Sequence, residues 1–118
     1  MQMRRHARMS RAILTLGLSL LAFPSWAQVA KTVTNSSAQL VPAQTRGMLS
    51  VCNQSSTDTI SYCFADTTGS CTAALNTAGQ FTVSPLNCST WHPGEGVPHT
   101  AIYAITGGTS TPVTVVEK

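Results

Sequence analysis

GMLSVCNQSSTDTISYCFAD, residues 47–66, is the stretch that decides the fold. Apolar and polar residues alternate in two runs, and the more apolar rows are Leu49, Val51 and Asn53, then Ile60, Tyr62 and Phe64. Because successive strand side chains point to opposite faces, this period of two predicts two β-strands, each with one row in a core. The polar connection at 53–59 contains Asn, Ser and Asp, which favour turns. The stretch therefore predicts a β-hairpin with one cysteine in each arm.

Residues 1–27 have the pattern of a secretory signal peptide. Arginines precede an apolar run at 12–23, AILTLGLSLLAF, and small residues at Ser25 and Ala27 suit a cleavage site. The apolar run is shorter than the roughly 20 residues that a membrane-spanning helix needs. We expect cleavage before Gln28, a secreted or periplasmic location, and no membrane span once the signal peptide is removed.

The mature chain that this cleavage predicts is short and almost uncharged. Removing 27 residues from the 118 leaves 91, enough for one domain with a modest core. Three basic residues remain against four acidic ones, so the formal net charge is −1: Lys31, Arg46 and Lys118, against Asp58, Asp66, Glu95 and Glu117. Without a basic patch, no nucleic-acid partner is expected. Few carboxylates remain for acid–base chemistry, and no catalytic residue is predicted.

All four cysteines lie in this mature part: Cys52, Cys63, Cys71 and Cys88. An even number in a short exported chain predicts two disulfides. The close ligand pairs of a zinc site are missing, so neither a metal nor another cofactor is expected. Two pairings stay open. Cys52–Cys63 with Cys71–Cys88 would staple the hairpin, and Cys52–Cys88 with Cys63–Cys71 would place its first arm beside a later strand.

The rest of the mature chain alternates between short apolar runs and turn residues. Residues 28–38 are read as a flexible leader or an edge strand, and 39–118 as one domain. Further short strands are expected near 71–75, 81–84, 88–91, 100–106 and 112–117, and 100–106 is apolar on both faces, as in a central strand. No helical periodicity is present in this part of the sequence. The pattern predicts an all-β fold, a small β-sandwich (jelly-roll or immunoglobulin-like) of about seven short antiparallel strands.

One loop supplies the candidate ligand-binding residues, Trp91, His92, Glu95 and His99. His and Glu can bind zinc, but Pro93 and Pro98 exclude the helix that the H-E-x-x-H motif requires, so an exposed polar loop is the favoured interpretation. An exposed Trp91 would stack on a sugar ring, and the strand aromatics Tyr62, Phe64 and Tyr103 would complete such a platform. Packing in the core is the favoured interpretation for Trp91 too, and it is favoured more strongly for the other three, which fall within predicted strands.

Three stretches resemble small β-domains encoded by tailed phages and prophages. They are Leu40-Val41-Pro42-Ala43 with Arg46, Leu49, Val51 and Asn53; Ile60-Ser61-Tyr62-Cys63-Phe64; and residues 97–105 with Gly107-Gly108 and 112–117. The resemblance implies a β-fold and a virion or accessory structural role, and it carries over no functional residues. The signal peptide and the four cysteines depart from that group and indicate a role outside the cytoplasm.

These observations together predict an exported, non-catalytic module that acts through surface contacts. Its partner would be another protein or a second copy of the chain. The alternatives are a phage or prophage virion protein of the decoration type, and a small carbohydrate-binding module centred on Trp91 with a glycan as its ligand.

Overall fold

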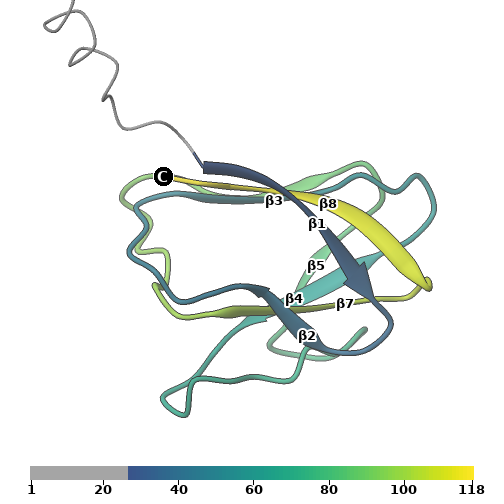
Figure 1. The fold of residues 1–118 in the computed structure, drawn as a ribbon, viewed down its shortest axis with the longest axis horizontal. Helices are drawn as coiled ribbons and strands as arrows, with labels where there is room; N and C mark the ends of the chain where they lie inside the picture. The colour runs from purple at the N-terminus through teal and green to yellow at the C-terminus, as the bar shows by residue number, and fades with distance from the viewer. Residues whose placement is uncertain (1–26) are drawn as a thin grey trace, which may run out of the picture.

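The computed structural model describes residues 27–118, which form two antiparallel four-stranded sheets packed face to face (Figure 1). One sheet has the order β1-β8-β3-β6, and its strands are β1 (Ala27–Thr34), β8 (Ser110–Glu117), β3 (Leu49–Asn53) and β6 (Cys88–Trp91). The other has the order β2-β7-β4-β5, and its strands are β2 (Ala38–Val41), β7 (Ile102–Thr106), β4 (Ile60–Phe64) and β5 (Phe81–Val83). The predicted all-β sandwich is confirmed.

The predicted hairpin is wrong, although both of its strands exist. β3 pairs with β6 and β8 in one sheet, whereas β4 pairs with β5 and β7 in the other. The connection at 54–59 therefore crosses from sheet to sheet. The period of two fits this arrangement equally well, because Leu49 and Val51 enter the core from one side and Ile60 and Tyr62 from the other, all fully buried.

The core lies between the two sheets and consists of the inward rows of their strands. Its buried members are Val33, Leu40, Val41, Leu49, Val51, Ile60, Tyr62, Val83, Val97, Ile102, Ala104, Val113 and Val115. β7 lies between β2 and β4, which confirms its predicted central position. Its outward residues Tyr103 and Ile105 are half-buried, which explains why the run is apolar on both faces.

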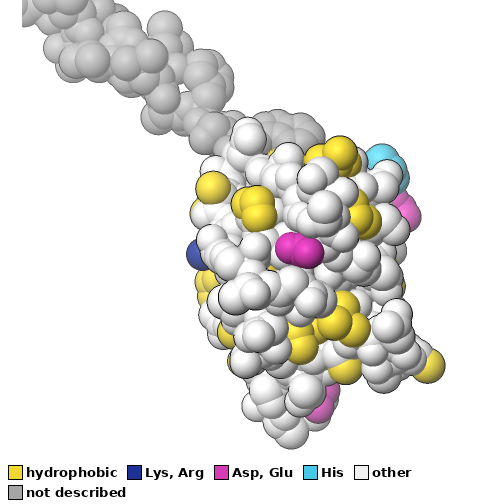
Figure 2. All heavy atoms as spheres, turned by 90° about the vertical axis from the view of Figure 1, so that its right-hand side faces the viewer, with side chains coloured by type: hydrophobic (Ala, Val, Ile, Leu, Met, Phe, Trp, Pro, Cys, Tyr) yellow, Lys and Arg dark blue, Asp and Glu magenta, His cyan; other side chains and the backbone are white. Residues whose placement is uncertain are grey.

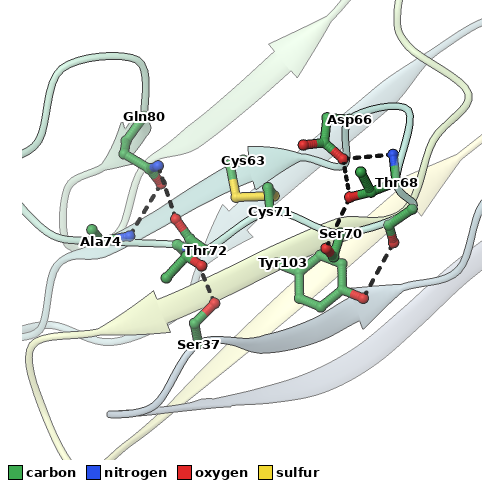
Figure 3. Close-up of a disulfide and its surroundings, with 12 residues drawn as sticks. Ser37, Cys63, Asp66, Thr68, Ser70, Cys71, Thr72, Ala74, Gln80 and Tyr103 are labelled. Atoms are coloured by element: carbon green, nitrogen blue, oxygen red, sulfur yellow. Dashed lines mark hydrogen bonds between the residues drawn. A yellow bond between two sulfur atoms is a disulfide. The ribbon is translucent and has the colours of Figure 1, made fainter.

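A loop at 65–80 covers the outer face of β4, and it replaces the strand expected at 71–75. Cys63, on that outer face, bonds to Cys71 in the loop (Figure 3). Ser61 and Cys63 are consequently buried, at 0% and 5% exposure, although they lie outside the core. The loop is why β4 is buried on both faces.

At residues 72–74 of this loop, side chains bond to the backbone in place of a neighbouring strand. The Ala73 amide donates to Ser37 Oγ at 2.8 Å, and the Ala74 amide donates to Gln80 Oε1 at 3.2 Å. Gln80 Nε2 in turn donates to the Thr72 carbonyl at 3.2 Å (Figure 3). These contacts hold residues 72–74 in an irregular conformation, so no ladder forms there.

The second disulfide joins two neighbouring strands. Cys52 in β3 lies directly opposite Cys88 in β6, with their Cα atoms 4.0 Å apart, and the two are bonded. Of the two pairings left open, the nested one, Cys52–Cys88 with Cys63–Cys71, is therefore confirmed. The alternative that staples a hairpin is wrong, because Cys52 and Cys63 belong to different sheets.

The N-terminal strand β1 pairs with β8 in an unbroken register, from Ala27 opposite Glu117 to Thr34 opposite Ser110. Residues 28–34 thus form an edge strand, one of the two alternatives for that segment. The predicted signal peptide lies outside the described residues except for Ala27. Within residues 27–118 no helix is long and apolar enough to cross a membrane.

Candidate functional site

Trp91, at the end of β6, belongs to a cluster of four aromatic rings that we call the aromatic corner: Tyr62, Phe64, Phe81 and Trp91. Phe64 and Phe81 each approach the indole edge-on, with ring centroids 5.4 Å away. Phe81 stacks on Tyr62 at 5.2 Å. These rings come from β4, β5 and β6, so the cluster joins the two sheets at the border between β5 and β6.

The polar groups of the aromatic corner form hydrogen bonds with one another and with Ser89. Trp91 Nε1 donates to Tyr62 Oη at 3.1 Å, and Tyr62 Oη shares a 2.6 Å hydrogen bond with Ser89 Oγ. Trp91 is half-buried and packs against the core. Its ring and its N–H are thus used in packing, which favours the core interpretation over a sugar platform.

Phe81 brings the aromatic corner to the surface. Its side chain is 37% exposed, whereas Tyr62 is fully buried. Sequence reasoning missed this residue as a site candidate, although its alternation with Thr82 placed it in a strand. Tyr103 lies apart from the corner, on the outer face of its sheet, where its hydroxyl donates to the Gly69 carbonyl at 3.5 Å (Figure 3).

The loop after Trp91 is exposed and closed by its own contacts. His92, Glu95 and His99 are all exposed. Glu95 Oε1 accepts a 2.5 Å hydrogen bond from the His92 amide, and the Glu95 amide donates to the His92 carbonyl at 3.1 Å. Across residues 27–118, no three His, Cys, Asp or Glu side chains lie close enough together to hold a metal ion.

A buried arginine, which sequence reasoning also missed, organises the end of the sandwich beside this loop. Arg46 is 2% exposed, and its Nε donates to Glu117 Oε2 at 2.7 Å. Its other nitrogens donate to three backbone carbonyls, those of Pro98 (2.6 Å), Thr100 (2.9 Å) and Pro42 (3.1 Å). We call this set the Arg46 knot. It ties the two segments around 42–46 and 98–100 to the end of β8.

The remaining carboxylates also accept hydrogen bonds from their own surroundings. Asp58 Oδ2 accepts from Thr111 Oγ1 at 3.1 Å. Asp66 Oδ1 accepts from the Thr68 hydroxyl at 2.5 Å and from its amide at 2.8 Å (Figure 3). These bonds, the hydroxyl first, lower the pKa of Asp66 below its ordinary value. Each carboxylate of residues 27–118 thus stabilises a local piece of structure.

Residues 27–118 carry seven charged side chains, and two of these, Arg46 and Glu117, are buried. Figure 2 shows one face on which hydrophobic side chains are scattered among uncharged polar groups, with isolated acidic and basic residues.

Comparisons with known proteins found no matching family model, no matching curated protein and no matching solved structure. The geometry described above is therefore the basis for assigning a function.

Proposed function

We propose that this chain is an exported, non-catalytic module that acts through surface contacts. The observation that carries the proposal is that the carboxylates and cysteines of residues 27–118 are bonded to other groups of the fold. Glu117 is part of the Arg46 knot, Asp58 and Asp66 bond to threonines, and Glu95 closes its own loop. All four cysteines are in disulfides.

Catalytic acids and bases are usually groups whose pKa the protein shifts towards neutrality in a cleft. The pKa of Asp66 moves the other way, downwards, which makes its carboxylate a weaker base. Asp66 is also exposed. These facts favour a role in binding over a role in proton transfer.

Export is supported by the two disulfides together with the basic and apolar pattern of residues 1–27. Disulfides persist in oxidising compartments, and small exported domains rely on them because their cores are modest. The low charge of the surface fits a module whose contacts use hydroxyl and apolar groups.

The test is to express the full chain in a bacterium, separate the cell fractions and weigh the protein by mass spectrometry. We expect a chain that begins at or near Gln28 in the exported fraction, lighter by two hydrogens for each of its two disulfides. A chain with an intact N-terminus and four free thiols would contradict the proposal.

A carbohydrate-binding role has one observation in its favour, the 37% exposed Phe81 ring at the edge of the aromatic corner. Aromatic faces stack on the apolar faces of sugars. A glycan array tests this role with Phe81→Ala, and Leu86→Ala is the matched control because Leu86 is exposed too, at 68%. Binding that Phe81→Ala alone abolishes would support it, and no binding to any glycan would exclude it.

A further inference from the structure

The four outer strands of the two sheets differ in how well they resist pairing with another strand. β2 has four residues, carries an irregularity between Gln39 and Val41, and ends before Pro42. β5 has three residues, and β6 has four and is bonded to β3 through Cys88. Short strands, bulges, prolines and charged side chains, especially lysine, are the features that protect sheet edges.

β1 lacks the first three of these protections, and Lys31 is its one charged side chain. The predicted cleavage removes Ala27, and the seven residues of β1 that remain, QVAKTVT, contain no proline and pair with β8 without a bulge. In an antiparallel ladder the peptide groups point alternately to the two sides of a strand. About half of those in β1 therefore point away from β8, along an edge roughly 23 Å long.

The side chains of β1 also leave this edge open. Val33 is buried, whereas Val29 is 41% exposed, and Ala30, Thr32 and Thr34 are small and exposed. Val and Thr favour extended strands. The chemistry of such an edge, alternating donors and acceptors without bulky cover, fits another extended strand.

We propose that β1 pairs edge to edge and antiparallel with β1 of a second copy of this chain. The pairing would join two four-stranded sheets into one continuous sheet. This inference rests on the proposed function, because it names the partner of a module that acts by contact.

A second copy fits because β1 is complementary to itself in one register. When Ala30 faces Ala30 across a two-fold axis, Lys31 of each copy lies opposite Val29 of the other. Like charges are then not directly opposed, which would otherwise weaken the pair. The formal net charge of −1 for residues 28–118 adds little long-range repulsion between copies.

An edge contact of one strand per copy buries less than the roughly 1,600 Å² of a standard interface. The dimer is therefore expected to be weak and reversible, with a Kd of roughly 1 µM to 1 mM. Its population should rise with protein concentration over that range.

Sedimentation velocity of the full chain, isolated after any processing, measures this association. Two charge substitutions at Val29 test the register. Val29→Glu places a carboxylate opposite Lys31 and should tighten the dimer, whereas Val29→Lys opposes two cations and should weaken it, each by about two-fold to thirty-fold in Kd. Thr90→Lys, on the exposed face of β6, is the control and should leave the Kd unchanged.

Circular dichroism checks that the variants remain folded, and hydrogen exchange of the unmodified chain gives a second readout. Alternate amides of β1 should gain protection as the concentration rises. A monomer at every concentration overturns the strand pairing but leaves export and contact with other partners intact. A dimer that responds equally to both Val29 substitutions, or that Thr90→Lys disrupts, overturns it as well.

Discussion

Arg46 shows how much one residue contributes to this small domain. Its guanidinium is buried, yet every nitrogen donates to an oxygen, so the charge is compensated within the Arg46 knot. Nothing local to Arg46 predicts this burial. Except for the Pro42 carbonyl, its acceptors lie more than fifty residues further along the chain, at Pro98, Thr100 and Glu117.

Replacing Arg46 by alanine should lower the free energy of unfolding by about 3–5 kcal/mol. The substitution leaves the Glu117 carboxylate buried without its cation, and an uncompensated buried charge is costly. Urea denaturation measures the change. Adding Glu117→Gln to Arg46→Ala removes that charge and should recover part of the loss. A double variant that loses the sum of both single effects would contradict this account.

The Asp66 carboxylate should titrate below its ordinary pKa of 3.8, chiefly because the Thr68 hydroxyl bonds to its charged form. A lowered pKa in the folded state contributes stability above pH 3.8, and this contribution is lost as the pH falls through the lower, folded value. NMR titration of the carboxyl carbon measures the pKa. Thr68→Val should raise it, whereas Thr67→Val, which removes no bond to Asp66, should not.

At the scale of a single element, the turn between β7 and β8 contains two adjacent glycines, Gly107 and Gly108, with different surroundings. A Cβ on Gly108 would meet the Asp58 carboxyl group, with the Cγ at 2.5 Å, whereas a Cβ on Gly107 would meet Leu75 Cδ1 at an ordinary 3.6 Å. Asp58 in turn accepts the bond from Thr111, which is fully buried and paired with Thr106. Because Gly108 has no Cβ, the Asp58 carboxylate can lie against it and keep its hydrogen bond to Thr111.

Gly108→Ala should destabilise the protein by about 1–3 kcal/mol, because the methyl group displaces the Asp58 carboxylate from Thr111. Gly107→Ala should be neutral or stabilise by up to about 1 kcal/mol, since it restricts the unfolded chain without a clash. Thermal or urea unfolding of both variants measures the difference. Equal effects of the two substitutions would show that the Asp58 contact is unimportant.

Each disulfide stabilises a different element. Cys52–Cys88 spans 36 residues and holds β6, with Trp91, against β3, whereas Cys63–Cys71 spans 8 and holds the 65–80 loop on β4. Replacing each pair by alanines should cost about 4 and about 2.5 kcal/mol respectively, because the longer loop gains more entropy when it is freed. Urea denaturation gives the two costs, and hydrogen exchange should show extra opening of β6 in one variant and of the loop in the other.

At the scale of the whole molecule, period-two patterns located nearly every strand but did not place them in sheets. The alternation of Leu49 and Val51 shows that one face is buried, and it is the same whether the next strand lies beside it or across the core. The six residues at 54–59 are long enough for either path. For the same reason, the sequence predicts only part of the candidate site. It points to Trp91, but the contacts of Trp91 with Phe64 and Phe81 depend on how the two sheets pack.

Reduction of both disulfides together should remove about 6 kcal/mol, which is comparable to the whole stability of a typical domain, about 5–15 kcal/mol. We expect the reduced and alkylated chain to lose most of its β-sheet signal or to melt far below the oxidised protein. Circular dichroism during heating measures this. An unchanged melting temperature would show that the core alone maintains the sandwich.

The nested pairing also has a consequence for the order of oxidation. In a chain that becomes oxidised as it emerges N-terminus first, Cys52 and Cys63 are the first two thiols to meet, and they are not partners. A bond between them would hold β3 and β4 together as a hairpin, which is absent from the native fold. Reaching the native state from there requires thiol–disulfide exchange once Cys71 and Cys88 have followed. Folding of this chain is therefore expected to depend on a disulfide isomerase, or on a delay in oxidation until Cys88 has emerged.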